Sequence, residues 1–306
     1  MFCVVLDCGG QLSNGPGGPL AEAEKRGMTV RRLRVSEIPT RQELKELDAY
    51  AREILPEDPT PSLDDIAAQP DVRHLGKPAP APQAQYLREQ LRVIVAGSDA
   101  ALSAVLTRMM RGDYLWAEVG FVPTTGASTA ATNWGLPEDP AAAWALALDG
   151  AVKPVPLIRN DAGLAVAGSA TIAEWTNEPI TGEIIVDDAV LLRADRDKHT
   201  FGAKLVPMVE DPGILAAKAV SPVSPVSPVA SAEGQESVVK RKRGLFRFLR
   251  KDPAPGQLDP ASVLTGRAVQ AGGPQLRVSV DGESAKRPVT RVTFYRHLRD
   301  LQVVRP

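Results

Sequence analysis

The spacing of apolar residues in the first half of the chain alternates between strand and helix patterns. Residues 2–6 and 91–97 form apolar runs typical of buried strands, and each run ends in a turn of small or polar residues. The other elements expected here are helices at 20–25, 40–55 and 99–111, a strand at 28–35 and a strand that ends at Pro123. Strands that alternate with helices predict an open α/β sheet.

Beyond residue 158 the pattern changes to strand after strand. Six segments rich in β-branched and apolar residues follow, at 162–172, 182–193, 203–209, 263–270, 276–280 and 289–294. Consecutive strands joined by short turns predict an antiparallel β-sandwich. The length of 306 residues fits two domains of about 150 residues each. We therefore expect an α/β domain over residues 1–158 and a β-sandwich domain over 159–294.

Two segments fall outside this pattern. Prolines recur through residues 56–82, which predicts an insertion or a surface strap. Residues 219–257 contain the repeat SPVSPVSPV, which cannot pack as a helix and predicts a disordered linker.

Charge and cysteine content narrow the class of protein. The formal net charge is −1 and the pI is near 6.4, so no global attraction to nucleic acid or membrane is expected. Cys3 and Cys8 lie close together, and the three histidines are scattered, so neither a disulfide framework nor a zinc site is predicted. The N-terminus has no signal-peptide pattern, and no apolar run approaches membrane-spanning length. We expect a soluble, cytoplasmic protein.

Seven basic residues between Lys240 and Lys251 form a local exception to this balance. If the segment is helical, Leu245, Phe248 and Leu249 lie on one face and arginines on the other. A cationic amphipathic segment favours peripheral contact with an anionic membrane surface, at about 1 kcal/mol per basic residue. A solvated linker and nucleic-acid binding are the alternatives, and nucleic acid is the least favoured because no other feature indicates it.

Two turns at the carboxyl ends of predicted strands carry the candidate chemistry, because ligands of open α/β sheets bind there. The first turn reads GSDAA (residues 97–101) and the second reads PTTGAS (residues 123–128), followed by Ala131 and WGLP (residues 134–137). In order and spacing these pieces resemble the diacylglycerol kinase catalytic domain, whose superfamily includes NAD kinase and sphingosine kinase. That family reads GGDGT in the first turn and roughly P-x-G-T-x-N in the second. Here two glycines and the threonine of GGDGT are replaced.

The resemblance implies a nucleotide site and a catalytic centre. Residues that would hold the phosphates of ATP, with Mg²⁺ bridging to acidic groups, are Gly97, Ser98, Asp99, Thr125, Gly126 and Ser128. Asp281-Gly282-Glu283 matches a D-G-E motif of the family, so Asp281 or Glu283 would take the proton of the substrate hydroxyl. The resemblance also implies that the tail, residues 295–306, returns to the first domain.

The residues themselves leave simpler alternatives open. Asp99 is equally suited to cap the helix that follows it, and the hydroxyl-rich second turn to cap its own helix. Asp281-Gly282 is also a typical hairpin turn. The pair Asp187-Asp188 favours a turn over a position at the domain interface.

Two hypotheses of function follow. One is a divergent diacylglycerol kinase-like enzyme that transfers phosphate from ATP to a lipid hydroxyl, a reaction that needs positioning and charge neutralisation. The other is a catalytically inactive pseudokinase that serves as a binding or scaffold module at the membrane. NAD kinase activity is a weaker third hypothesis, since nothing points to a dinucleotide substrate. The sequence leaves the oligomeric state open.

Overall fold

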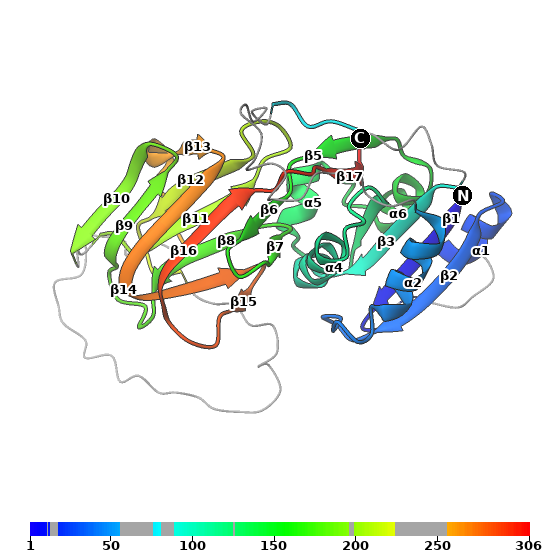
Figure 1. The fold of residues 1–306 in the computed structure, drawn as a ribbon, viewed down its shortest axis with the longest axis horizontal. Helices are drawn as coiled ribbons and strands as arrows, with labels where there is room; N and C mark the ends of the chain where they lie inside the picture. Colours follow the sequence, from blue (N-terminus) through cyan, green and yellow to red (C-terminus); the bar gives the residue numbers. More distant parts are fainter. Residues whose placement is uncertain are drawn as a thin grey trace, which may run out of the picture.

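In the computed structural model, the chain forms two lobes that are each built on one sheet (Figure 1). The structure describes residues 1–10, 12, 18–55, 76–80, 89–124, 126–195, 199–223 and 256–306. The chain passes between the two sheets at residues 156–157 and again at residues 297–300. We call these two crossings the hinge. Within the described part of the chain, no helix is both long enough and apolar enough to cross a membrane.

The first lobe contains a six-stranded sheet with the order β2-β1-β3-β4-β17-β5. Its strands are β1 (Phe2–Cys8), β2 (Thr29–Val35), β3 (Leu91–Gly97), β4 (Glu118–Pro123), β5 (Val152–Val155) and β17 (Leu301–Val304). Neighbours from β2 to β17 run parallel, and β5 runs antiparallel to β17. The last strand of the chain thus lies inside the first sheet.

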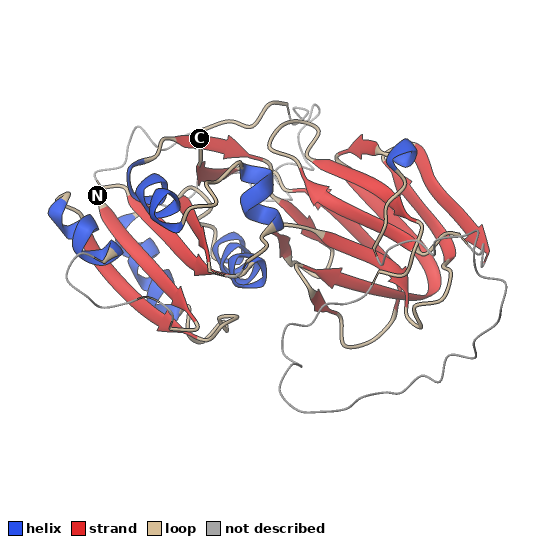
Figure 2. Ribbon diagram, turned by 180° about the vertical axis from the view of Figure 1, so that it is seen from behind, coloured by secondary structure: helices blue, strands red, loops and turns tan. Residues whose placement is uncertain are grey.

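Helices cover both faces of this sheet (Figures 1 and 2). They are α1 (Pro19–Lys25), α2 (Lys45–Ile54), α4 (Asp99–Arg111), α5 (Thr129–Trp134) and α6 (Pro140–Asp149). Because successive strand side chains point to opposite faces, Val4 and Leu6 pack in the cluster that contains α2, α4 and α5. Cys3 and Val5 pack in the cluster that contains α1 and α6.

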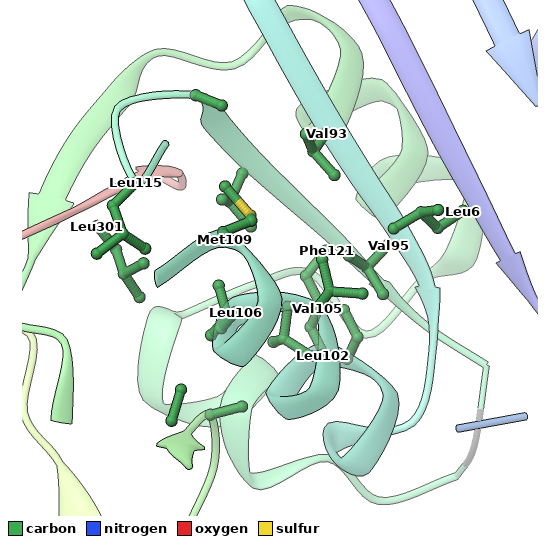
Figure 3. Packing of buried hydrophobic residues seen from close by; sticks show 14 of the residues in the cluster. Leu6, Val93, Val95, Leu102, Val105, Leu106, Met109, Leu115, Phe121 and Leu301 are labelled. Carbon is green, nitrogen blue, oxygen red and sulfur yellow. The ribbon is translucent and has the colours of Figure 1, made fainter. Parts of the chain in front are cut away.

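The central helix α4 has the bounds that the sequence predicts. Ser98 is its N-cap and accepts a hydrogen bond from the Ala101 N–H at 3.2 Å. Leu102, Leu106 and Met109 recur at helical spacing and are fully buried (Figure 3). Each such side chain contributes about 1.5–3 kcal/mol of burial free energy, so one face of α4 is fixed firmly to the sheet.

The second lobe is almost entirely β-sheet (Figure 2). Its elements are β6 (Ile158–Asn160), β7 (Ala165–Val166), β8 (Ala170–Glu174), β9 (Thr181–Val186), β10 (Ala189–Asp195), β11 (Gly202–Pro207), β12 (Ile214–Ala219), the 3₁₀ helix η2 (Pro260–Ser262), β13 (Leu264–Gly266), β14 (Ala268–Val280), β15 (Glu283–Ser284) and β16 (Val289–Arg296). All pairings in it are antiparallel. An α/β lobe followed by an antiparallel β lobe confirms the predicted fold class.

Four of the predicted strand segments differ from the structure. The segment 182–193 forms two strands, β9 and β10, because the chain turns at residues 187–188. The segment 162–172 is split into β7 and β8, because the chain bends at residues 167–169. The segments 263–270 and 276–280 were expected as separate strands, yet one long strand, β14, covers residues 268–280 and is preceded by the short β13. The register of β14 against β16 shifts between Gly272 and Leu276, and this bulge lets one strand pair with β9 and then with β8.

The pair Asp187-Asp188 forms the turn between β9 and β10, as the favoured alternative predicts. Asp187 has a positive φ of 49°. Its carboxylate accepts hydrogen bonds from the backbone N–H groups of Arg267 and Ala268. Asp187 therefore has a structural role at this end of the second lobe.

Candidate functional site

Asp99 lies at the start of α4 but caps a different helix. Its Oδ1 accepts a hydrogen bond from the Ser128 hydroxyl at 2.5 Å, and its Oδ2 accepts from the N–H groups of Thr129 and Ala130 at 2.8 and 3.2 Å. Ser128 in turn accepts from the Ala131 N–H at 2.9 Å. The expectation that Asp99 caps its own helix is wrong, because Ser98 does so. The carboxylate instead joins the first predicted turn to the second.

Gly97 is required by close packing. A Cβ atom there would lie 2.8 Å from the Cβ of Cys8 and 3.0 Å from the Cβ of Ala101. Its carbonyl accepts a hydrogen bond from the Thr124 N–H at 3.0 Å. Gly126, by contrast, has nothing within 4 Å of where a Cβ would stand. Thr125 lies outside the described residues.

Asp281 is the first residue of the tight turn between β14 and β15. It has a positive φ of 51°, followed by 89° at Gly282, so the D-G hairpin turn is present. Its carboxylate also accepts three hydrogen bonds at 2.7–2.8 Å from the backbone N–H groups of Ala167, Gly168 and Ser169. Burial raises the pKa of Asp281 to about 7, while these three N–H groups act to lower it. The side chain thus holds the bend between β7 and β8.

Gly168 connects Asp281 to Asp99. A Cβ atom at Gly168 would lie 2.5 Å from Asp99 Oδ2 and 2.9 Å from the Ala130 nitrogen. The Gly168 carbonyl accepts a hydrogen bond from the side-chain amide of Asn133 at 3.0 Å. We call Asp99, Ser128, Gly168 and Asp281 the acidic junction. The structure therefore brings predicted residues of both motifs together, through one glycine and across the two lobes.

Beside the acidic junction lies a cavity of about 430 Å³ between the lobes, which we call the interlobe cavity. One face of α4 forms its wall, together with the segment before α2 and the β14–β15 hairpin. Its lining residues are Ile38, Pro39, Arg41, Leu44, Ala100, Ser103, Ala104, Thr107, Arg108, Arg111, Leu164, Val280 and Glu283. Glu283 is the only predicted site residue that lines it, among the residues that the structure describes.

The sequence did not single out the arginines of this cavity. Arg41 and Arg111 are exposed at its rim, and the Arg111 guanidinium donates to the Ala162 carbonyl at 3.1 Å. Arg108 forms a bidentate ion pair with the buried Asp48, which also accepts a hydrogen bond from the Tyr114 hydroxyl. The spacing of Ala100, Ala104, Arg108 and Arg111 on one helical face was the available signal for this wall.

Asp99 and Ser128, which are predicted to hold ATP and Mg²⁺, are engaged with other groups of the protein in this structure. Both oxygens of the Asp99 and Asp281 carboxylates accept hydrogen bonds from protein donors. The N–H groups of Thr129 and Ala130, which the second turn would present to a phosphate, already donate to Asp99. Among the described residues, no three His, Cys, Asp or Glu side chains are grouped so as to hold a metal ion. The predicted nucleotide and metal roles of these residues therefore stay untested predictions.

No family model matches the sequence, and no curated protein matches it. Solved structures do resemble it. A diacylglycerol kinase from Bacillus anthracis str. Sterne has a TM-score of 0.53 at 12% sequence identity, over 100% of this chain and 96% of that chain. Two structures of candidate diacylglycerol kinases from the same organism have TM-scores of 0.56 and 0.54 at 11% and 12% identity, with the same coverage. The chain therefore has the diacylglycerol kinase-like fold, and it has both lobes of that fold.

Proposed function

We propose that this chain is a non-catalytic protein with the diacylglycerol kinase-like fold, and that its interlobe cavity binds a ligand with an apolar body and an anionic head. The observation that carries the proposal is the contrast between the acidic and the basic side chains where the lobes meet. The two aspartates of the acidic junction are engaged by protein donors, whereas arginines line the cavity. This proposal corresponds to the second of the two hypotheses, a catalytically inactive pseudokinase that serves as a binding module.

The lining of the cavity supports this class of ligand. Its apolar part consists of Ile38, Pro39, Leu44, Leu164 and Val280. The volume lies within the range of about 300–1,000 Å³ that small-molecule sites occupy. An aliphatic chain can fill the apolar part and desolvate its walls.

Two arginines are placed to receive the anionic head. The charge of Arg108 is neutralised by Asp48, so Arg108 contributes little to anion binding. Arg41 and Arg111 stand at the exposed rim, and an arginine guanidinium binds phosphate and carboxylate groups through paired N–H donors. The head would therefore lie at the rim and the apolar body inside.

The test is a calorimetric titration of the whole chain with dodecyl phosphate, kept below the concentration at which it forms micelles. We expect binding that weakens about tenfold in Arg41→Gln and in Arg111→Gln, since each loses a charged hydrogen bond to the head. Arg291→Gln, at an exposed arginine on β16 away from the cavity, is the matched control and should bind like the wild type. No binding, or equal weakening in all three variants, would refute the proposed site.

ATP-dependent phosphate transfer to a lipid hydroxyl is the second candidate function. One observation favours it: the Glu283 carboxylate lines the cavity, where it is free to act as a general base. Incubation with diacylglycerol vesicles, Mg²⁺ and γ-labelled ATP distinguishes the two functions. Labelled lipid that disappears in Glu283→Gln would establish the kinase and refute the non-catalytic proposal.

The basic segment between Lys240 and Lys251 lies outside the described residues. Its contact with an anionic membrane surface, which would make the protein peripheral, is part of the proposal. Co-sedimentation with phosphatidylserine vesicles tests it. Binding should fall when the seven basic residues are changed to glutamine and when the salt concentration is raised.

A further inference from the structure

Residues 76–80 cross the hinge between the two lobes. This short piece of the proline-rich segment, which we call the strap, has the sequence GKPAP. It contacts the chain where β16 of the second sheet leads into β17 of the first sheet. The strap is therefore bound to the connection on which the angle between the lobes depends.

Among the residues that the structure describes, three hydrogen bonds hold the strap, and each uses a backbone group of the strap. Arg296 Nη1, at the end of β16, donates to the Gly76 carbonyl at 2.8 Å. The Ala79 N–H donates to Asp300 Oδ2 at 3.0 Å, and the Ala79 carbonyl accepts from Gln302 Nε2 at 3.3 Å. These three partners come from β16, from the hinge and from β17, so the strap bridges both lobes.

The two side chains that donate hydrogen bonds to the strap are buried. Arg296 and Gln302 are each only 5% exposed. Arg296 also forms ion pairs with Asp211 at 3.0 Å and with Asp300 at 2.9 Å. The two crossings of the hinge are bonded to each other, because the His297 N–H donates to the Leu157 carbonyl at 2.8 Å.

Release of the strap leaves no charge without an ion-pair partner. Arg296 keeps Asp211 and Asp300 as partners when Gly76 leaves. Binding is also inexpensive in entropy, since Pro78 and Pro80 already restrict the strap to extended conformations. A segment that can leave without unpairing a charge, and that loses little conformational entropy when it binds, is suited to a reversible change between a docked and a released state.

We propose that the strap is a releasable clamp on the hinge, and that its docking fixes the angle between the lobes and hence the width of the interlobe cavity. The cavity depends on this angle because its walls come from both lobes: α4 lies in the first, while Val280 and Glu283 lie in the second. The inference concerns the motion of the lobes and does not require that the proposed ligand is correct.

The test uses Ala79→Pro in the full chain. Proline removes the N–H that donates to Asp300 and places its ring there, while the site is on the exposed surface and outside any helix or strand. Hydrogen exchange of residues 296–302 should become about tenfold faster, the change that follows from the loss of one or two hydrogen bonds. Exchange of the core strand at residues 91–97 should not change. Lys77→Ala, on the same strap but not among the docking groups, should behave like the wild type.

A second measurement reports on the lobes directly. Spin labels at Glu24→Cys and Glu178→Cys, exposed positions in the first and second lobes, give the distance between them, and the native Cys3 and Cys8 are buried. Ala79→Pro should broaden the distance distribution. Unchanged hinge exchange with an unchanged distribution would overturn the proposal. Faster exchange that includes residues 91–97 would overturn it too, since that is general destabilisation.

Discussion

Gly168→Ala should destabilise the protein by about 3 kcal/mol, because the added methyl group would displace the Asp99 carboxylate. Its Cβ would lie 2.5 Å from Asp99 Oδ2, a distance that cannot be kept. Moving Asp99 breaks hydrogen bonds from Ser128, Thr129 and Ala130, and hydrogen bonds to charged groups contribute about 1.5–3 kcal/mol each. Gly168 does not have a positive φ, so backbone strain adds nothing to this cost.

Urea denaturation monitored by tryptophan fluorescence measures the effect. Gly126→Ala is the matched control, since it makes the same substitution in the neighbouring turn, where nothing lies within 4 Å. It should change the free energy of unfolding by less than about 1 kcal/mol. In the double variant with Asp99→Ala, the total cost should be smaller than the sum of the single costs by about 1–2 kcal/mol, because both changes break the same contacts. A cost below about 0.5 kcal/mol for Gly168→Ala, or exact additivity with Asp99→Ala, would refute the acidic junction.

Three further predictions concern stability. Burial raises the pKa of Asp281 from 3.8 to about 7, so its folded form holds a proton that the unfolded chain releases. The contribution of this proton to the free energy of unfolding is complete below pH about 4 and is lost as the pH rises through about 7. Urea midpoints of the wild type should therefore fall relative to those of Asp281→Asn across that window. A constant difference between the two midpoints would contradict the raised pKa. Hydrogen bonds from the Ser36 hydroxyl and from Thr40 lower the pKa of Glu43 from 4.5 to about 2. Its contribution is present above pH about 4.5 and lost as the pH falls toward 2, so acid unfolding of Glu43→Gln should show a smaller dependence on pH in that range than that of the wild type. Asp48→Ala leaves Arg108 and Tyr114 without their carboxylate partner, so it should lower the free energy of unfolding, measured by thermal denaturation, by about 3–5 kcal/mol. Tyr114→Phe, which keeps the ion pair, should lower it by about 1 kcal/mol. Equal losses in the two variants would show that the ion pair does not account for the stabilisation.

The fold class followed from the sequence because local periodicity determines it. The helix that ends near Arg111 was predicted correctly, because Leu102, Leu106 and Met109 mark its buried face, although its N-cap is Ser98. The long strand β14 was missed because a Gly-Gly-Pro sequence in its middle looks like a turn. The segment is one strand with a bulge only because it pairs with β16 on one side and with β9 and β8 on the other, which is a tertiary property.

The site was less predictable than the fold, because its contacts join distant parts of the chain. Asp99 had two interpretations, as a residue of the nucleotide site or as the cap of its own helix, and no local feature of the sequence indicates that its carboxylate meets residues 128–130. Gly168 carried no signal at all, since its importance depends on the distance to Asp99. The interlobe cavity was missed for the same reason: Arg41, Arg111 and Glu283 are separated by long stretches of sequence and meet only when the lobes pack.

The D-G-E motif at residues 281–283 is weak support for catalysis. Asp281 has a positive φ that aspartate tolerates well, and its carboxylate holds three N–H groups of the bend at residues 167–169. A protein that never transfers phosphate would still need it, and the same holds for Asp99, which holds α5. Glu283 differs from both because it is exposed on the cavity and has no comparable structural task among the described contacts. Retained aspartates therefore do not distinguish an enzyme from a binding protein on this fold, and the glutamate is the residue whose substitution does.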